Sequence, residues 1–445
     1  MVLYLPYWIT KKVENEEITL FNWAHNYSVN IYDKSHPAYK LLDSDHIDSD
    51  HINIYNNEYE EDVNWLIEEK FLVSENNYSD RFSESKRFSN DTLDLILLPA
   101  GEACNLNCIY CYEDHNDKSR MKSEHVDILL NLVKNQNKKN LKLEYFGGEP
   151  MLNMNFIKKF SKSLLDNNIQ FSGAITTNGT LINKERLDEL YQANIKSFQI
   201  TLDGPRERHN LLRASNSKSL DSFDGVTNAL KTIVESSYED IVVTLRINVN
   251  HHSIEKYNFE KLIAVIESTL PKNDPRFFIL PKAIGDYSSA NLRNNEEAKM
   301  EYCKTSTKEK EVLQVFEDYI AHNYNSANVM LLTKQGRYSC YAGNPNSLVI
   351  TPDLKVRKCT VALNVPINIV GFIDKNGIYQ KNENLNLWIK DYSDKYCNTC
   401  IAQKTCQGSS CPLANIKANK KICPPIKQEI NVLTQQVVKF YDKFN

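Results

Sequence analysis

Eleven cysteines are the feature of this 445-residue sequence that most limits what the chain can be. An odd number of cysteines cannot all pair within one chain, and a reducing compartment discourages disulfides. The first residues, MVLYLPYWIT, lack the basic stretch, the long apolar stretch and the cleavage site of a signal peptide, so we expect a cytoplasmic protein. Clustered cysteines that stay reduced most often bind metal. The cysteine clusters are therefore expected to be metal sites.

The first cluster is Cys104-x3-Cys108-x2-Cys111, which directly follows an apolar segment, 93–98, predicted to be a strand. Three thiolates on one short loop can bind three irons of a 4Fe–4S cube and leave the fourth iron open to another ligand. Zinc is the alternative, because His115 could complete a closed four-ligand site. Recurring zinc motifs use paired Cys-x2-Cys spacings, so the pattern favours an iron–sulfur cluster.

A second motif, Gly147-Gly148-Glu149-Pro150, follows the next predicted strand and contains the only Gly-Gly pair in the sequence. Glycine is scarce here, with 13 in the whole chain, so the pair is informative. Without Cβ atoms, backbone carbonyls can approach the ammonium group of a ligand closely, and Glu149 can add a charge-assisted hydrogen bond. Alone the motif is equally a plain turn, but beside a three-cysteine loop it predicts a ligand site.

Short apolar segments alternate with helical periodicity over residues 93–325, which predicts a parallel sheet covered by helices. The helices are indicated by apolar residues at helical spacing, such as Val126, Leu129 and Val133. Six βα units are too few for a closed eight-stranded barrel. We therefore predict an α/β fold, a partial (β/α)6 TIM barrel with its functional loops at the C-terminal ends of the strands. The six predicted strands are LDLILL, LKLEYF, IQFSGAIT, KSFQITL, IVVTLRI and RFFILP.

Residues 1–75 are predicted to form a separate small α+β module. EITLFN and YSVNIY alternate at period two and indicate a β-hairpin, and two short helices follow at 37–42 and 60–70. The sequence Asp-Ser-Asp-His-Ile is repeated at 43–47 and 48–52 and could bind a cation, although a solvated loop is the simpler interpretation. Residues 76–92 are polar and are expected to be a linker.

Seven more cysteines lie in the C-terminal segment, residues 326–445. In a reducing compartment such a density indicates metal ligands, either of iron–sulfur clusters or of two zinc knuckles. Cys303, alone on an apparent helix, is expected to be an ordinary thiol. The seven are Cys340, Cys359, Cys397, Cys400, Cys406, Cys411 and Cys423.

Together these motifs resemble the radical S-adenosylmethionine (SAM) enzymes, and the resemblance extends through the six βα units. ACNLNCIYCYE resembles the cluster loop of that family, with Tyr110 before the third cysteine, and FGGEP resembles its ammonium-binding motif. TTNGTLI and ITLDGPRERHNLLR resemble segments that line the cofactor. The resemblance implies that SAM binds the open iron and that one electron cleaves it to methionine and a 5′-deoxyadenosyl radical, which takes a hydrogen atom from the substrate.

The same resemblance implies roles for single residues. Tyr110, Gly147, Gly148 and Glu149 would contact SAM, and Thr201 and Arg213 would contact its ribose or its carboxylate. The alternative for Thr201 and Arg213 is that they only hold the loop after the fourth strand.

The C-terminal cysteines resemble the SPASM domain, which carries two auxiliary 4Fe–4S clusters, so the resemblance implies three clusters in all. Leu354 stands where the family usually has glycine, and the spacing between Cys406 and Cys411 is one residue longer than usual. Seven thiolates cannot fill eight iron sites, so one iron could bind a substrate thiolate, water or another side chain. The implied ligands are Cys340, Cys359 and Cys411 for one cluster and Cys397, Cys400, Cys406 and Cys423 for the other.

The resemblance leads us to expect a radical SAM/SPASM maturase, of oxidoreductase or lyase type, that forms a thioether cross-link in a ribosomally made precursor peptide. The N-terminal module resembles the winged-helix element in which a leader peptide adds to a sheet edge. A flavodoxin or ferredoxin would donate electrons. With a net charge of −4 and no long apolar run, no nucleic-acid or membrane partner is expected.

Other functions fit the same residues. Carbon–carbon or carbon–oxygen macrocyclisation, or epimerisation, could use an identical scaffold. Sulfatase maturation fits less well, because those enzymes place the first cluster close to the N-terminus. An iron–sulfur electron carrier or a zinc-dependent binding protein would explain the cysteines but not the Gly-Gly-Glu-Pro turn.

Overall fold

The computed structural model divides into two compact units, each described here by itself. One contains residues 89–328 and 341–389, and the other contains residues 1–88, 329–340 and 390–445. The structure describes residues 3–6, 8–23, 29–43, 46–47, 60–73, 89–115, 117–217, 219–285, 315, 319–320, 323–327, 340–397, 400–401, 406 and 411–423.

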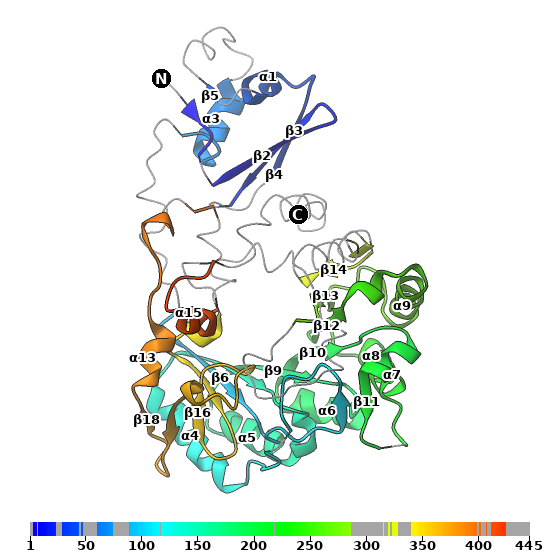
Figure 1. Cartoon of the computed structure of the whole chain (residues 1–445), viewed down its shortest axis with the longest axis vertical. Helices are drawn as coiled ribbons and strands as arrows, with labels where there is room; N and C mark the ends of the chain where they lie inside the picture. Colours follow the sequence, from blue (N-terminus) through cyan, green and yellow to red (C-terminus); the bar gives the residue numbers. More distant parts are fainter. Residues whose placement is uncertain are drawn as a thin grey trace. The chain divides into compact units, whose positions relative to one another are not determined.

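A parallel sheet forms the centre of the first unit (Figure 1). Its six main strands pair in the order of the chain, and every pairing is parallel. All six predicted strands are therefore confirmed, together with the partial-barrel fold class. The strands are β6 (Thr92–Leu97), β8 (Asn140–Tyr145), β9 (Phe171–Thr177), β10 (Ile195–Thr201), β12 (Val242–Val249) and β13 (Phe277–Ala283).

Helices connect these strands and bury one apolar face each. The residues that predicted the first helix, including Leu129 and Val133, are buried as expected. Two helices begin at side-chain caps, since Asn183 and Asp221 accept hydrogen bonds from backbone N–H groups three residues later. The helices are α4 (Glu124–Gln136), α5 (Met154–Asp166), α6 (Lys184–Gln192), α7 (Arg206–Leu212), α8 (Ser222–Val234) and α9 (Lys256–Thr269), with 3-10 turns η1 (Pro150–Asn153) and η2 (His251–Ile254).

The sheet continues beyond the six predicted strands. At one edge β14 (Asn325–Ser326) adds to β13, and at the other β15 (Ser347–Ile350) pairs in parallel with β6. Three short antiparallel strands follow β15, so part of the cysteine-rich segment extends the barrel sheet. They are β16 (Lys355–Arg357), β17 (Ile369–Ile373) and β18 (Tyr379–Lys381), accompanied by η3 (Tyr341–Gly343), η4 (Pro366–Asn368) and α13 (Asn384–Ile389).

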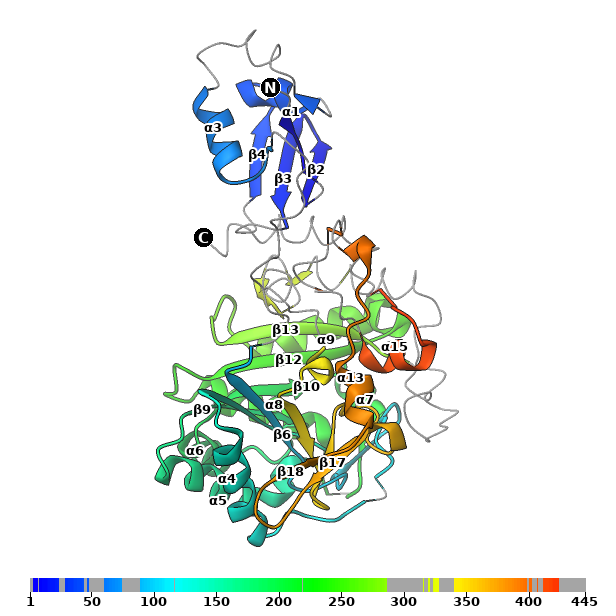
Figure 2. The same cartoon turned by 90° about the vertical axis from the view of Figure 1, so that its left-hand side faces the viewer.

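The N-terminal module has a three-stranded antiparallel sheet with helices beside it (Figure 2). The predicted hairpin is present as β3 (Glu17–Asn22) and β4 (Val29–Asp33), and β2 (Ile9–Glu14), which was not predicted, pairs with β3. The helices α1 (Pro37–Asp43) and α3 (Glu60–Glu68) agree with the two predicted ones, and β1 (Leu3–Tyr4) pairs with β5 (His46–Ile47). Buried residues such as Ile18, Leu20, Leu42 and Leu66 form one core.

The C-terminal part of the second unit contains η5 (Lys395–Cys397) and α15 (Pro412–Ala418). Several predictions lie outside the described residues: most of the linker, the second Asp-Ser-Asp-His-Ile copy, Cys303 and the last helix. Within the described part of the chain, no helix has both the length and the apolar character that crossing a membrane would require.

Candidate active site

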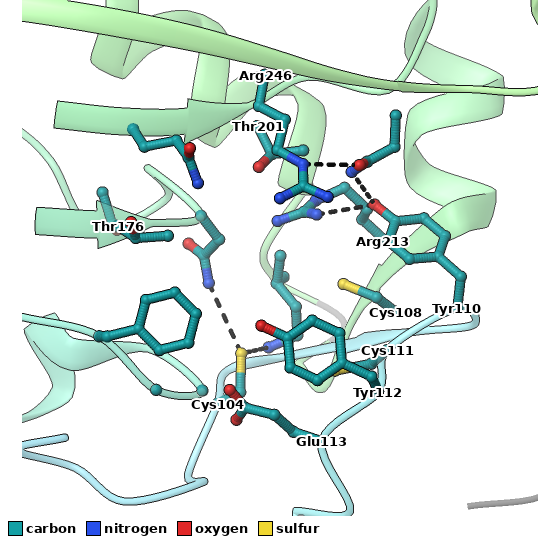
Figure 3. A pocket seen from close by; sticks show the side chains of 18 of the residues that line it. Cys104, Cys108, Tyr110, Cys111, Tyr112, Glu113, Thr176, Thr201, Arg213 and Arg246 are labelled. Atoms are coloured by element: carbon teal, nitrogen blue, oxygen red, sulfur yellow. Dashed lines mark hydrogen bonds between the residues drawn. The ribbon is translucent and has the colours of Figure 1, made fainter. Parts of the chain in front are cut away.

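A cavity at the C-terminal ends of the sheet strands gathers most of the predicted site residues (Figure 3). The cluster loop contributes Cys104, Cys108 and Cys111, and the turn after β8 contributes Gly147 and Gly148. Tyr110, Thr201 and Arg213 line the same cavity, but Glu149 does not. Three thiols and a glycine turn, separated by about forty residues in the sequence, thus meet at one hollow because parallel strands bring their following loops to one edge.

The cluster loop is tied to the segment that follows α7. Its central strand β7 (Leu106–Cys108) pairs antiparallel with β11 (Arg213–Ser215). Asn216 extends this contact, since its amide donates to the carbonyl of Cys104 at 3.0 Å and its backbone N–H donates to Asn105 at 3.0 Å. The ladder and these hydrogen bonds hold the cluster loop against residues 213–216.

Burial makes the cluster-loop thiols weak acids. Burial, followed by the charge of Glu149, raises the pKa of Cys104 to about 12. Burial, followed by the charge of Glu113, raises the pKa of Cys111 well above its usual value. Thiols of this kind are poor nucleophiles, but a soft metal can displace their protons and bind the thiolates. Their chemistry is that of metal ligands rather than of catalytic nucleophiles.

The described residues contain no group of three His, Cys, Asp or Glu side chains gathered closely enough for one metal ion. His115 lines the cavity, and its Nδ1 donates to the carbonyl of Glu102 at 2.7 Å. Cys104, Cys108 and Cys111 all line this one cavity, as the ligands of a single cluster would.

The glycine turn packs directly on the backbone of the cluster loop. A Cβ on Gly147 would lie 2.4 Å from the carbonyl oxygen of Gly101, and one on Gly148 would lie 2.5 Å from that of Ala103. Hydrogen bonds connect the same segments, from Gly148 N to Gly101 O at 3.2 Å and from Glu149 N to Ala103 O at 2.9 Å. The glycines are thus required to hold the cluster loop, in addition to any contact with a ligand.

Glu149 is completely buried, and its carboxylate connects the glycine turn to the end of β9. It accepts hydrogen bonds from the backbone N–H groups of Met151 at 3.0 Å and Asn178 at 2.8 Å, and from the Thr177 hydroxyl at 2.8 Å. Burial raises the pKa of Glu149, while these donors oppose that rise. Its predicted contact with an ammonium group stays a prediction, and the structure adds this connecting role.

Tyr110 belongs to a polar network in the wall of the cavity. Its hydroxyl donates to Asp203 and accepts from Arg213 Nη1 at 2.9 Å and Asn248 Nδ2 at 3.1 Å. Arg213 and Asp203 also form an ion pair at 3.6 Å. The aromatic residue before the third cysteine therefore connects the cluster loop to the segment after β10 and to β11 and β12.

Thr201 and Arg213 both line the cavity, and their contact with the ribose or the carboxylate of SAM stays a prediction. Both are buried, and Arg213 Nε is a buried donor for which the described residues supply no hydrogen-bond acceptor. An orphaned donor beside three thiols and a glycine turn fits a ligand that carries hydrogen-bond acceptors, as SAM does. The residues present therefore fit both a 4Fe–4S cluster and SAM.

The C-terminal cysteines are distributed over both units. Cys340, Cys397, Cys400, Cys406, Cys411 and Cys423 belong to the unit with the N-terminal module, and Cys359 belongs to the barrel unit. Cys397 is buried at the end of η5, where Lys421 Nζ lies 3.1 Å from its sulfur. Cys411 is exposed and precedes α15. The ligand sets assigned to the two auxiliary clusters stay predictions.

The sequence interpretation missed three polar residues of this region: Asp203, Arg246 and Asn248. Arg246 and Asn248 lie on β12, where they alternate with the buried Leu245 and Ile247. A charged residue on the inward face of an otherwise apolar strand was the available signal.

Comparison with known proteins adds the family. Residues 98–263 match the radical SAM superfamily model. A cysteine-type anaerobic sulfatase-maturating enzyme from Clostridium novyi is 30% identical over 206 residues, which cover 42% of this chain and 54% of that protein. The radical SAM cyclopropyl synthase TigE from Paramaledivibacter caminithermalis is 23% identical over 261 residues, which cover 52% and 54%. The chain thus spans about half the length of these relatives.

Among solved structures, native anSMEcpe with bound AdoMet and Cp18Cys peptide matches with a TM-score of 0.57 at 19% identity. The match covers 79% of this chain and 96% of that one, and at this identity it establishes the fold only. The matched family segment begins at the end of the first barrel strand and includes all three cluster-loop cysteines and the glycine turn. The chain therefore contains a domain of the radical SAM superfamily.

Proposed function

We propose that this protein is a radical SAM enzyme that modifies a ribosomally made peptide and joins a cysteine sulfur to a carbon in a thioether cross-link. The observation that carries the proposal is the shared cavity, which Cys104, Cys108 and Cys111 line together with the Gly147-Gly148 turn. When bound, a 4Fe–4S cluster with one open iron would supply the electron that converts SAM to methionine and a hydrogen-abstracting adenosyl radical.

The residues of this chain would prepare that cavity in three ways. The three cysteines would hold the cluster, and the carbonyls of the glycine turn would accept hydrogen bonds from the ammonium group of SAM. Thr201 and Arg213 would contact the ribose or the carboxylate. The covering helices and the buried network around Tyr110 would exclude water from the cavity. A reactive radical requires such a dry site.

The C-terminal cysteines support the finer part of the proposal. They would bind two auxiliary 4Fe–4S clusters, with one iron open to the thiolate of the substrate cysteine. Thioether formation removes one hydrogen atom from the carbon, which ends on deoxyadenosine, and one proton from the thiol. The carbon–sulfur bond then forms, and the remaining electron passes to an iron–sulfur acceptor, so the net reaction consumes one SAM and needs no net reductant.

The N-terminal module would bind the leader of the peptide. Its antiparallel sheet has two outer strands, β2 and β4, and a strand-shaped peptide can add to such an edge through backbone hydrogen bonds. A flavodoxin or ferredoxin would deliver the electron that starts each turnover.

Cysteine-directed sulfatase maturation is a second candidate, because the relative from Clostridium novyi, which is 30% identical over 206 residues, carries that name. The two candidates differ in their product. Thioether formation leaves a cross-linked peptide that lacks two hydrogen atoms and resists alkylation of the cysteine, whereas sulfatase maturation converts the cysteine to an aldehyde that an aldehyde-specific hydrazide labels.

The proposal is tested with anaerobically reconstituted protein and candidate cysteine-containing peptides, chosen from short reading frames in the neighbourhood of its gene. We expect about twelve irons per chain, formation of deoxyadenosine, and a peptide product two hydrogens lighter that is lost when cysteine is replaced by serine. About two zinc ions and no iron would contradict the whole proposal. Modification that persists in the serine peptide would contradict the thioether.

A further inference from the structure

Two arginines line the cavity, and their surroundings differ. Arg213 is compensated, because Asp203 lies 3.6 Å away and the Tyr110 hydroxyl accepts a hydrogen bond from its Nη1. Arg246, on β12, has no carboxylate within ion-pair distance among the described residues. Its side chain is only half-buried, so the charge faces the hollow rather than the core.

Arg246 is nevertheless held in one orientation. Its Nε donates to Asn248 Oδ1 at 2.8 Å. Asn248 is fixed in turn, because its Nδ2 donates to Asp203 Oδ1 at 3.1 Å and to Tyr110, and its backbone N–H donates to Asp203 at 2.9 Å. One edge of the guanidinium is thus anchored to the same network that fixes the cluster loop.

The two terminal nitrogens of Arg246 have no hydrogen-bond acceptor in the part of the chain that the structure describes. Strand register pairs Arg246 with Thr201, and Figure 3 shows both projecting into the cavity from neighbouring strands. An arginine keeps its charge at every physiological pH, and its planar fork matches the two oxygens of a carboxylate. The guanidinium of Arg246 is held in one orientation, has no carboxylate partner among the described residues and lines a cavity. This arrangement indicates an anionic ligand.

We propose that Arg246 is the docking site for a carboxylate that enters this cavity with a ligand. The inference rests on the proposed function, in which two ligands can carry that group. SAM carries it on its methionine part, and the substrate peptide carries it on an aspartate or glutamate side chain near the modified position. The positive charge would hold that ligand in one orientation toward the cluster loop.

The experiment compares anaerobically reconstituted wild-type protein with Arg246→Gln, Arg246→Lys and a matched surface control, Arg186→Gln. Arg186 lies on α6, where it pairs with Glu189 in solvent, so its loss should change no ligand affinity. Equilibrium dialysis measures the Kd of SAM and of methylthioadenosine, which lacks the ammonium and the carboxylate. A second series measures binding, in the presence of SAM, of cysteine-containing peptides that differ only in one glutamate or glutamine.

If the carboxylate is that of SAM, Arg246→Gln raises the Kd of SAM about tenfold or more and leaves the Kd of methylthioadenosine unchanged. If it belongs to the peptide, SAM affinity is unchanged, wild type prefers the glutamate peptide, and Arg246→Gln removes that preference. Arg246→Lys should restore part of the lost SAM affinity or of the lost peptide preference. Lysine keeps the positive charge but lacks the planar group that binds both oxygens of a carboxylate. Equal affinities of wild type and Arg246→Gln for SAM, with no preference between peptides, would overturn the inference.

The wild-type arm separates this inference from the proposed function. A reconstituted wild-type protein that binds no SAM and forms no deoxyadenosine contradicts the proposed function itself. A wild type that does both, beside an Arg246→Gln variant with unaltered affinities, contradicts only the role of Arg246. Unchanged methylthioadenosine binding shows that the variant is folded.

Discussion

Cys108 and Arg213 stand opposite each other in the antiparallel ladder between β7 and β11. This pairing fixes a permanent cation beside one of the three cluster-loop thiols. Burial alone would lower the pKa of Arg213, but Cys108, Tyr110 and Asp203 raise it well above the ordinary value, so the charge is retained. The ladder thus provides both the shape of the loop and a positive charge near the thiolates that a cluster requires.

Gly148→Ala should damage the site through the backbone. The new methyl group would lie 2.5 Å from the carbonyl oxygen of Ala103 and 2.6 Å from that of Glu102, and neither atom can rotate away. We expect a loss of about 1–3 kcal/mol in the free energy of unfolding, measured by urea denaturation, with weaker SAM binding. Gly225→Ala is the control, because the atoms nearest to its methyl group would be those of Thr180, at 3.0 Å or beyond, and because it lies in a helix, which favours alanine. Equal effects of the two variants would contradict this account.

Glu149→Gln tests the carboxylate that joins the glycine turn to β9. Glutamine has one acceptor oxygen, so its NH2 group must face one of the donors Met151 N, Asn178 N or Thr177 Oγ1. A loss of about 1–3 kcal/mol in stability should follow. Glu144→Gln is the matched control, since Thr176 is its single hydrogen-bond donor among the described residues and glutamine can still accept from it. A Glu149→Gln protein as stable as wild type would show that the connecting role is absent.

His209 should make stability depend on pH. Burial, with the neighbouring Arg213 charge, lowers the pKa of this histidine to about 4, and its Nδ1 accepts from the backbone N–H of Asp203. In the unfolded chain this histidine binds a proton near pH 6.5. The contribution of neutral His209 to the free energy of unfolding is therefore complete above that pH and falls as the pH decreases toward 4. Between pH 7.5 and pH 5 the loss should be about 2 kcal/mol.

Urea unfolding of the metal-free chain at the two pH values measures this loss of stability. The His209→Gln variant should not show it. His252→Asn, at an exposed position, should retain the wild-type difference. A pH dependence that survives in His209→Gln would assign it to other groups.

Much of the barrel could be predicted because its strands are short apolar segments that build a buried core. Leu143, Ile175, Phe198 and Leu245 are all buried on strands that were predicted from short apolar segments between helical patterns. The strands β7 and β11 have three residues each, too few to show a period, and their pairing depends on contacts between segments far apart in the sequence.

The cysteines and the glycine turn could be predicted because their residue types restrict the chemistry. The partners of Glu149 and Tyr110 could not, because a sequence does not show which side chains meet behind a loop. Asp203 and Asn248 are buried polar residues that contact the Tyr110 hydroxyl, and Asp203 also pairs with Arg213.

The assignment of the auxiliary ligands predicts an iron count for each variant. Cys359→Ala and Cys397→Ala should each lower the iron content of the reconstituted protein from about twelve toward about eight, and the double variant should lower it toward about four. All three should keep the cluster of the barrel, so reductive SAM cleavage persists. A double variant with the iron content of either single variant would place both cysteines on one cluster.

The account rests on the three thiols of the cluster loop, and one measurement tests it most directly. Deoxyadenosine formation from SAM and dithionite is measured for wild type and for a variant with Cys104, Cys108 and Cys111 all replaced by alanine. The wild type should form deoxyadenosine, and the variant should form none while it keeps about eight of about twelve irons. Deoxyadenosine formation by the variant at the wild-type rate would contradict the central claim.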